Sequence, residues 1–429
     1  MSDKLNIWIL QTGEPIHLDD DMPRPMRGMN LSNKLVELGH NINFISSVFY
    51  HQKKVHRSKA NRINKINSQL KITLIDSPGY KKNISFSRFY DHMIMAYNLK
   101  MFLDQTVETP DVVFIGYPPI EISYVMSKWL KKRKIPFILD IKDQWPDLIL
   151  GAFPSFIKFF GKLILFPYYY MAKQTINNAN AITSMSKSFI DWSKNYKNKN
   201  IDSISMILPL VPSENILQEN EVISTKKWCD NMGIINRDGQ VNIFFVGSLS
   251  KAFDFQTIIK CAKKLELINK NIKFIICGDG EFKELLVRQA KSQSNIVLPG
   301  WVDINKIKII ASRSLFAIAP YKNIKNFKDN IPNKIIDYLS LGLPIISPLQ
   351  GEVSNLISKN NIGMSYIENS ENSLSDIIVS LSKNIDLINR LSNNALKLYN
   401  ENYSFNHVYG KAEMLIKEIY LLNKKISNQ

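Results

Sequence analysis

The stretch QVNIFFVGSLSKAFDFQTIIKCAKKLELINKNIKFIICGDG, residues 240–280, decides the fold. The apolar run in Gln240–Ser250 predicts a buried strand, Phe255–Leu267 has the apolar spacing of an amphipathic helix, and Asn271–Gly280 predicts a second strand. Both strands run into a glycine turn. A strand, a helix and a strand in this order are typical of parallel strands in a sheet that carries helices on both faces.

The same alternation continues on both sides of this stretch. Further strands are predicted at Leu5–Leu10, Asn41–Ser47, Asp111–Tyr117, Pro136–Asp143, Ala179–Ser186, Asn295–Gly300, Leu315–Pro320 and Ile345–Ser347. The region Asp202–Gly239 has little periodicity and is interpreted as a linker. We therefore predict an α/β protein with two Rossmann-like, doubly wound parallel-sheet domains, residues 1–208 and 209–405. A final helix is predicted at about residues 406–429, and it could pack back on the N-terminal domain. Because ligands of such sheets bind at the carboxyl ends of the strands, the site is expected in a cleft between the two domains.

Length, charge and cysteine content narrow the class of protein. The 429 residues exceed one ordinary core and fit two domains. No secretion signal or bilayer-spanning apolar run is recognised, and Cys229, Cys261 and Cys277 lack the spacing of a zinc site or disulfide scaffold, so a cytoplasmic location is expected. The net charge of +17 either reflects a lysine-rich composition or indicates phosphate-bearing substrates or an anionic membrane surface. The lysines are spread along the chain, which disfavours nucleic acid as a partner.

Glycine turns at the ends of the second-domain strands are candidate phosphate sites. In VGSLSKAFD, Gly247 and Ser248 let the backbone approach a ligand closely, and Lys251 stands at the helix entrance, where it can reach an anion. In CGDGE, Gly278 and Gly280 form a second turn on the next strand of the same sheet. The alternatives are an ordinary strand-to-helix turn with a surface lysine and a simple tight turn.

The stretch DNIPNKIIDYLSLGLPIISP, which begins at Asp329, predicts a helix with an acid in its middle. Asn330 is expected to cap this helix, and Pro332 suits its first turn. If the amides at this end face a diphosphate, Asp337 can accept two hydrogen bonds from a ribose, and Asp329 can meet the transferred sugar. By helical spacing Lys334 shares a face with Asp337. The alternative is a capped helix with a solvated acid.

Three other strand ends carry candidate residues. In NIVLPGWV, Trp301 and Val302 could cover a flat base, although core packing is the alternative for Trp301. Gly13 lies at the end of the first strand, in a loop expected to face the cleft. Asp143, in IKDQWPD, is a candidate for orienting the acceptor or donor, with a structural turn acid beside Trp145 as the alternative.

Two loops and one apolar segment also carry charged or apolar residues of interest. The acidic run Asp19–Asp21 is interpreted as a solvated loop and not as a metal site. The basic loop Val48–Arg57 could meet an acceptor diphosphate, with a plain solvated loop as the default. The segment Gly151–Gln174 is densely apolar, and Lys158 and Lys162 share a face of it. We favour contact with an anionic membrane interface over a buried helix for this segment.

Taken in order, several segments resemble the retaining glycosyltransferase family four, which has the two-domain GT-B fold. They are GHNINFIS, LDIKDQWPD, FFVGSLSKAFD, ICGDGEF, NIVLPGWV and IPNKIIDYLSLGLPIIS, and they cover nearly the whole chain. The spacing of Asp329 and Asp337, D-x7-D, is similar to the acidic E-x7-E region of that family. The segments MPRPMRGMNLSNKL and VFYHQKKVHR also resemble the bacterial surface-polysaccharide transferases, of O-antigen or capsule type.

The resemblance implies a UDP- or GDP-sugar donor held mainly by the second domain, and transfer with retention of anomeric configuration without a metal or other cofactor. Carried over by position, Lys251 and the amides from Ile331 and Pro332 onward would hold the diphosphate. Gly278, Gly280 and Val302 would border the nucleotide, while the two acids of the D-x7-D pair would bind the ribose and the donor sugar.

The resemblance also implies an acceptor, and the sequence departs from the family in places. A lipid-linked glycan precursor is the expected acceptor, reached from the cytoplasmic side of the membrane, with Lys251, Asp329 and Asp143 assigned to catalysis. Both acids of the D-x7-D pair are aspartates where glutamate is usual, and Ser248 stands where many members have an arginine. The alternatives are a GT-B epimerase acting on the nucleotide sugar and a binding protein without turnover.

Overall fold

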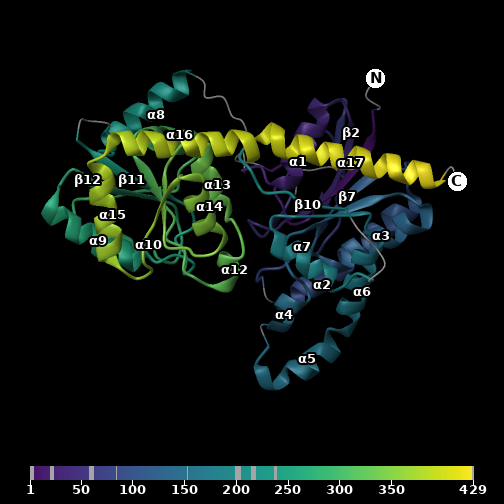
Figure 1. Cartoon of the computed structure of the whole chain (residues 1–429). Helices are drawn as coiled ribbons and strands as arrows, with labels where there is room; N and C mark the ends of the chain where they lie inside the picture. The colour runs from purple at the N-terminus through teal and green to yellow at the C-terminus, as the bar shows by residue number, and fades with distance from the viewer. Residues whose placement is uncertain are drawn as a thin grey trace. The chain divides into compact units, whose positions relative to one another are not determined.

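The computed structural model describes residues 4–19, 24–57, 62–83, 85–151, 153–198, 204–213, 219–235 and 239–427. The chain divides into two compact units. Unit 1 consists of Met1–Ser213 and Val408–Gln429, and unit 2 consists of Glu214–His407. Figure 1 shows the elements of both units along the chain.

In the described residues, unit 1 contains an eight-stranded sheet in the order β10-β9-β8-β7-β1-β2-β6-β5. Its strands are β1 (Asn6–Leu10), β2 (Asn41–Ser47), β5 (Ile63–Lys65), β6 (Leu70–Ile75), β7 (Val112–Tyr117), β8 (Phe137–Ile141), β9 (Ala181–Ser184) and β10 (Ile204–Ile207). Neighbouring strands pair in parallel, except that β5 is antiparallel to β6. A small antiparallel hairpin joins β3 (Phe49–Tyr50) to β4 (Val55–His56).

The central strands of unit 1 are parallel and covered on both faces. Every residue of β7 and β8 is buried, which is the pattern of strands covered on both faces by helices. The helices of this unit are α1 (Arg27–Glu37), α2 (Phe86–Gln105), α3 (Ile120–Arg133), α4 (Asp147–Gly151), the 3-10 turn η1 (Ser155–Ile157), α5 (Lys158–Ile164), α6 (Phe166–Asn178), α7 (Lys187–Lys194) and most of α17 (Phe405–Ser427).

The last helix, α17, packs on unit 1. Tyr409 of α17 is fully buried, and its hydroxyl accepts a hydrogen bond of 3.2 Å from Asn30 Nδ2 of α1. Glu413 Oε1 lies 3.2 Å from His40 Nε2, which is also buried. The chain therefore returns to its first unit at its C-terminal end.

In the part of the chain that the structure describes, unit 2 has a six-stranded parallel sheet in the order β13-β12-β11-β14-β15-β16. Its strands are β11 (Val241–Val246), β12 (Ile272–Cys277), β13 (Ile296–Gly300), β14 (Phe316–Ile318), β15 (Ile345–Ser347) and β16 (Gly363–Ser365). Its helices are α8 (Glu219–Asn231), α9 (Phe255–Ile268), α10 (Lys283–Ala290), α11 (Ile304–Ser312), α12 (Lys325–Lys328), α13 (Asn333–Ser340), α14 (Glu352–Asn360), α15 (Glu371–Ser382) and α16 (Ile385–Asn402).

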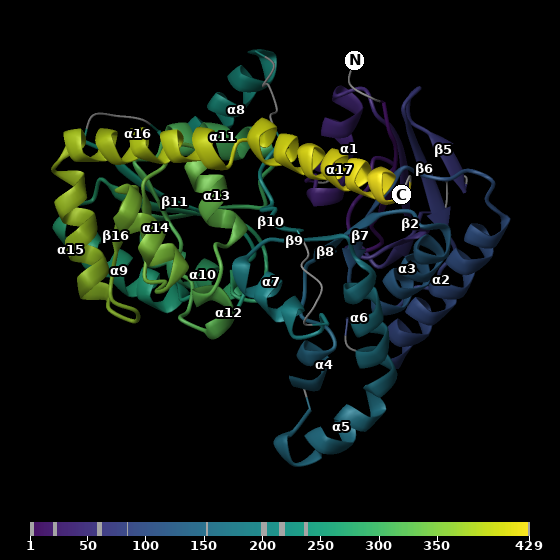
Figure 2. The ribbon, with the colours of Figure 1, turned by 45° about the vertical axis from the view of Figure 1, so that its right-hand side comes forward.

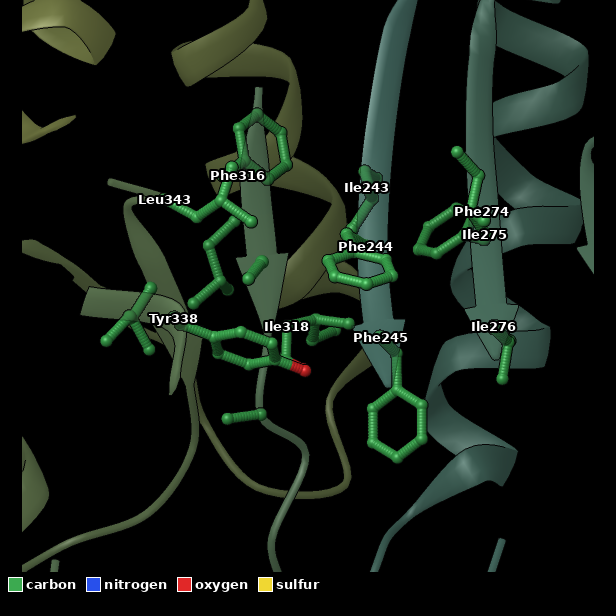
Figure 3. Packing of buried hydrophobic residues seen from close by; sticks show 14 of the residues in the cluster. Ile243, Phe244, Phe245, Phe274, Ile275, Ile276, Phe316, Ile318, Tyr338 and Leu343 are labelled. Carbon is green, nitrogen blue, oxygen red and sulfur yellow. The ribbon is translucent and has the colours of Figure 1, made fainter. Parts of the chain in front are cut away.

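The core of unit 2 is rich in aromatic residues. Figure 3 shows Phe244 and Phe245 of β11 with Tyr338 of α13 near the ends of the strands. All three side chains are essentially inaccessible to solvent. The Tyr338 hydroxyl donates to Ile318 O (3.2 Å) and accepts from Val246 N (3.3 Å). One buried side chain thus fixes α13 to the ends of β11 and β14.

Both sheets have a topological switch point, where consecutive strands leave in opposite directions. In unit 2 the order runs from β11 outward to β13 on one side, and the chain then returns to β14 on the other side. In unit 1 the corresponding point lies between β1 and β7. Ligands of open α/β sheets bind at the carboxyl ends of the strands beside such a point. The topology therefore gives each unit one favoured edge.

The region interpreted as a linker contains more structure than the sequence indicated. Residues 204–207 form β10 at the edge of the unit 1 sheet, and residues 219–231 form α8. Cys229 of α8 is fully buried in the core of unit 2. The helix was missed because most of its residues are polar and only a narrow apolar stripe, including Trp228 and Cys229, packs on the core.

Helices α4, α5 and α6 form an arm of unit 1. Figure 2 shows α5 at the tip of this arm, beyond α4 and α6. Large apolar side chains of the arm are mostly exposed: Leu148, Phe156, Phe159, Phe160, Leu163, Ile164, Phe166 and Tyr170. The alternative of a buried helix is therefore wrong for α5, although one face of α6 is buried. Among the described residues, the structure has no helix whose length and apolarity would let it cross a bilayer.

Candidate functional site

The carboxyl end of β11 is a turn that requires glycine. Gly247 has φ +149°, a backbone conformation that other residues rarely adopt, and its N–H donates to Cys277 O at 3.0 Å. A Cβ atom placed on Gly247 would collide with Nζ of Lys334. The side chain of Lys334 therefore fills the space that a larger residue would need.

The next turn along the sheet joins the first through its backbone. Gly278 N–H donates to Gly300 O at 2.7 Å, and Leu249 N–H donates to Asp279 O at 2.8 Å. A Cβ atom on Gly278, which has φ +143°, would overlap the carbonyl oxygen of Gly247. The turns after β11, β12 and β13 thus form one hydrogen-bonded cluster, which we call the glycine mouth (residues 247–251, 278–280 and 300–302).

Lys334 brings a cation to the glycine mouth from another element of the fold. It lies in the first turn of α13, is 9% exposed, and donates a hydrogen bond to Val246 O. Its Nζ lies 4.4 Å from the ring centroid of Phe245 and 5.2 Å from that of Phe253, so cation–π contacts also stabilise the charge. The sequence placed Lys334 on one face with Asp337 but did not assign it a role, because its contact with residue 247 joins segments 87 positions apart.

Lys251 stands in a different environment. It lies in the turn, four positions before the start of α9, and not at the helix entrance, which is capped by Asp254. Its N–H donates to Glu281 Oε1 (2.7 Å), and its Nζ lies 3.5 Å from Glu281 Oε2. The Lys251 side chain is 81% exposed, so this ion pair is weak. Ser248, beside it in the mouth, is also exposed.

Helix α13 begins later than the sequence indicated. Its N-cap is Pro332, without a side-chain hydrogen bond, so the expectation that Asn330 caps the helix is wrong. The reason is that the backbone is still extended at Pro332 and becomes helical only at Asn333. Ile331 and Pro332 are half-buried just before the helix, and Asp329 is exposed.

Asp337 lies on α13 one turn after Lys334 and is half-buried. Burial raises the pKa of the Tyr321 and Tyr338 phenols, and the nearby Asp337 carboxylate raises both further. This carboxylate therefore lies close to the two tyrosines at the strand ends. Its own setting is more enclosed than the solvated position that was the alternative.

Trp301 and Val302, which follow β13, differ in their exposure to solvent. Trp301 is 72% exposed, whereas Val302 is 5% exposed and belongs to the unit 2 core. The core-packing alternative for Trp301 is therefore wrong. An exposed indole beside the glycine mouth has a face available for stacking.

Gly13 and Asp143 come together in unit 1. Both line one cavity of about 170 Å³, which we call the unit 1 pocket. The pocket lies at the carboxyl ends of the strands on both sides of the switch point. Its lining residues next to strand ends are Thr12, Gly13 and Glu14 after β1, Ser47 in β2, Pro118 and Pro119 after β7, and Lys142 and Asp143 after β8.

Two acids of the unit 1 pocket, Glu14 and Asp143, have pKa values that shift in opposite directions. Burial would raise the pKa of Glu14, but its ion pair with Lys142 and a 2.7 Å hydrogen bond from Gly28 N outweigh burial and lower it. Burial raises the pKa of Asp143, although nearby cations oppose the shift. No hydrogen bond joins the Asp143 carboxylate to another described residue, so this acid is the better placed to accept a proton or a hydroxyl hydrogen bond.

Several charged residues that attract attention in the sequence have structural roles. Arg57 binds Asp19 through two hydrogen bonds and also donates to Ser47 O. Arg27 pairs with the buried Asp140 at 3.2 Å. The other two acids of the run 19–21 lie outside the described residues. In the described part of the chain, no group of three or more His, Cys, Asp or Glu residues is arranged to hold a metal ion.

Comparisons with known proteins bear on both units. The family model described as glycosyl transferases group 1 matches residues 232–398. An uncharacterized glycosyltransferase of Methanocaldococcus jannaschii is 29% identical over 255 residues, which are 56% of this chain and 55% of that protein. The chain thus matches about half the length of this curated relative.

Solved structures resemble the whole chain. WaaG, a glycosyltransferase involved in lipopolysaccharide biosynthesis, has a TM-score of 0.61 at 13% identity, covering 96% of this chain and 99% of that chain. Sucrose-phosphate synthase from Thermosynechococcus elongatus has a TM-score of 0.67 at 10% identity, covering 98% and 100%. Anabaena Alr3699/HepE, solved with UDP and glucose, has a TM-score of 0.61 at 11% identity, covering 96% and 100%. At these identities the likeness establishes the fold, which is GT-B as the sequence predicted.

Proposed function

We propose that this chain is a retaining, metal-independent glycosyltransferase that moves a sugar from a UDP- or GDP-linked donor to a lipid-linked glycan precursor in bacterial surface-polysaccharide biosynthesis. The observation that carries the proposal is the glycine mouth with Lys334 beside it. Three adjacent strand ends bring tight glycine turns and one enclosed ammonium group to the edge where open α/β sheets bind ligands. The match of residues 232–398 to glycosyl transferases group 1 supports the same assignment.

In the proposed reaction the leaving nucleoside diphosphate is stabilised at the glycine mouth. Lys334 is nearly buried, and a charge in such a setting acts on a phosphate more strongly than an exposed one. The amides that begin α13 add further donors, and Lys251 contributes from the exposed side of the turn. Asp337 binds the ribose hydroxyls, and the nucleotide base stacks near Trp301 and Val302.

The acceptor is bound by unit 1 in this proposal. Asp143 orients the acceptor hydroxyl or accepts its proton, because it is the acid of the unit 1 pocket that is not engaged by a lysine or a backbone amide. Asp329 is exposed and contacts the donor sugar. In front-face attack the acceptor oxygen bonds to the anomeric carbon on the side from which the diphosphate leaves, and a donor phosphate oxygen takes the hydroxyl proton in place of Asp143. This route retains the anomeric configuration without a protein nucleophile.

Contact with an anionic membrane is part of the proposal. Phe159 is 71% exposed and Leu163 is 60% exposed on α5. The same arm carries Lys158 and Lys162, which line a groove with Asp147. Apolar side chains next to lysines suit a segment that lies in a membrane interface. This arrangement would hold the enzyme peripherally at the cytoplasmic face, where a lipid-linked acceptor is available.

The proposed function is tested with nucleotide sugars and thermal unfolding. A UDP- or GDP-sugar that binds only the folded protein raises its melting temperature. The Lys334→Ala and Asp337→Ala variants should lose this shift while the ligand-free proteins melt cooperatively, and Lys251→Ala should reduce it. Unchanged shifts in Lys334→Ala and Asp337→Ala would refute the donor site.

Product analysis separates the alternatives. A transferase releases nucleoside diphosphate at an increased rate when an acceptor lipid is added. An epimerase converts the nucleotide sugar without an acceptor, and a binding protein does neither. Retention is read from the anomeric configuration of the isolated product, and an inverted product would refute that part of the proposal.

A further inference from the structure

One wall of the unit 1 pocket carries cations gathered around a tyrosine. The His51 Nδ1 atom lies 2.5 Å from the Tyr80 hydroxyl and 3.1 Å from Lys54 Nζ. Lys54 Nζ also lies 4.5 Å from the Tyr80 ring centroid. The Arg88 guanidinium lies 5.5 Å from the Tyr80 ring and 4.9 Å from the ring of Trp145. We call His51, Lys54, Tyr80 and Arg88 the Tyr80 cluster.

Positively charged groups act on His51 at this wall. Burial lowers the pKa of His51, and the charges of Lys54 and Arg88 lower it further, to about 4. Acids lie near these cations as well: Asp91 accepts hydrogen bonds from the Ser77 hydroxyl and from Gly79 N, and the charge of Arg88 acts on the Asp143 carboxyl group. Burial accounts for the largest part of this shift, and the remainder shows that positively charged groups lie near the imidazole.

Arg88 has unused hydrogen-bonding capacity. Its Nη1 donates to Asn83 O at 2.9 Å, but its Nε is buried and has no hydrogen-bond partner among the described residues. Buried donors are normally paired, so an unpaired one beside a cavity indicates a missing acceptor. Stacking on Trp145 holds the guanidinium plane, which preserves the fork geometry that suits an oxyanion.

We propose that the Tyr80 cluster binds a phosphate group of the acceptor, so that the unit 1 pocket takes phosphate-bearing acceptors. The assignment of this phosphate to an acceptor rests on the proposed function. Arg88 supplies the paired donors, and the Nε2–H of His51 supplies a further hydrogen bond, because the Nδ1 atom accepts from Lys54 and from the Tyr80 hydroxyl. Lys54, which lies beside the Tyr80 ring and outside the pocket lining, adds charge. Asp143 lines the same pocket, which places an acid and a phosphate site in one cavity.

The proposal is tested by isothermal titration with inorganic pyrophosphate. The Lys334→Ala background removes the enclosed charge of the proposed donor site and so weakens binding there, and the effect of an Arg88 substitution in this background is then assigned to unit 1. In this background Arg88→Ala should weaken the affinity by about 10- to 100-fold, as expected for lost charged hydrogen bonds. Arg88→Lys should give an intermediate loss, because it keeps the charge but not the fork. Arg62→Ala removes an equal charge from an exposed pair with Asp76 and should change the affinity less than twofold.

A second set of titrations identifies the source of the phosphate and guards against misfolding. Farnesyl diphosphate binding more tightly than glucose 1-phosphate would identify a lipid-linked group, and the reverse order would identify a free sugar phosphate. His51→Gln provides an independent variant if Arg88→Ala does not melt cooperatively. Pyrophosphate affinity that is undetectable in the Lys334→Ala background, or equal with and without Arg88, would overturn the proposal. Nucleoside diphosphate binding measured separately, with Lys334 intact, shows whether the proposed function fails independently.

Discussion

Unit 2 builds its strand-end site mainly from backbone, whereas unit 1 builds its pocket from side chains. In the glycine mouth, backbone groups of residues 247, 278 and 300 bond to neighbouring turns, and Lys334 supplies a nearly buried charge. In the unit 1 pocket, titratable side chains such as Asp143, His51 and Arg88 form the walls. Under the proposed function, the backbone-built site of unit 2 would take the phosphates that nucleotide sugars share, and the side-chain pocket of unit 1 could vary with the acceptor without disturbing the sheet.

The largest expected effect is on the free energy of unfolding, and it separates two glycines that follow strands, one in each unit. Gly278→Val should lower the free energy of unfolding by about 3–5 kcal/mol, because a Cβ atom there overlaps the Gly247 carbonyl and the backbone has φ +143°. Gly13→Ala should change it by less than about 0.5 kcal/mol, since a Cβ atom at Gly13 meets nothing within 4 Å. Urea unfolding measures both. Equal losses would contradict the contrast between the two units.

The next largest effect is on nucleoside diphosphate affinity, and it distinguishes Lys334 from Lys251. Lys334→Ala should weaken nucleoside diphosphate binding by about 30- to 100-fold, because an enclosed charged hydrogen bond is lost. Lys251→Ala should weaken it by about threefold, because its side chain is 81% exposed and already near Glu281. Isothermal titration with UDP and GDP gives both ratios. A larger loss of affinity in Lys251→Ala than in Lys334→Ala would show that Lys251, as the sequence predicted, is the main phosphate-binding lysine.

The pH dependence of stability tests the unit 1 pocket. The pKa of His51 is about 4 in the folded protein and about 6.5 in an unfolded chain. Between these values the unfolded chain binds more protons at this site, so the free energy of unfolding falls as the pH drops from about 6.5 to about 4. The groups facing His51 are Lys54 of the hairpin, Tyr80, and Arg88 and His92 of α2.

His51→Gln should remove about 1–2 kcal/mol of this pH-dependent loss, a value reduced for the partial exposure of the imidazole. Lys54→Gln should remove a smaller part, because one of the cations that depress the pKa is gone. Urea unfolding at pH 7 and pH 4.5 measures the slope. A His51→Gln protein with the wild-type slope would show that protonation of His51 does not cause the pH-dependent loss of stability.

The smallest effect is expected on the arm of unit 1. Phe159→Ser should leave the free energy of unfolding within about 0.5 kcal/mol of the wild type, since the side chain is 71% exposed. It should weaken binding to anionic vesicles by about fivefold, close to 1 kcal/mol of apolar transfer. Vesicle sedimentation provides the measurement, with Leu267→Ser as a control because Leu267 is 87% exposed on unit 2. Equal losses in both variants would remove the arm from the proposed membrane contact.

Features that depend on a few neighbouring residues were predicted from the sequence, and features that depend on packing or backbone angles were not. The strands β2 and β15 lie where the apolar pattern placed them, and the parallel sheets follow from strand–helix alternation. The helix α8 was missed because few of its residues are apolar. The cap of α13 was assigned to Asn330 although Pro332 occupies that position, because capping depends on backbone angles that the residue types permit but do not fix.

The residues of the candidate sites also divide into those that a local pattern identifies and those that only packing brings to the site. Gly247, Gly278 and Gly280 were identified because glycine after a buried strand is a local signal with a physical cause. Lys334 was noted only as a neighbour of Asp337, since its contact with Gly247 depends on how α13 packs on β11. The ribose, donor-sugar and acceptor roles of Asp337, Asp329 and Asp143 remain predictions.

The sequence by itself determined the alternation of elements, and therefore the α/β class and the positions of the strand-end turns, because apolar periodicity and glycine act over a few residues. The tertiary structure alone decided which charges surround those turns. Lys334 reaches the turn after β11 from another helix, and Arg88 reaches the unit 1 pocket from α2. Such contacts join residues far apart in the chain, and side chains of the same type are buried or exposed according to the packing of whole elements.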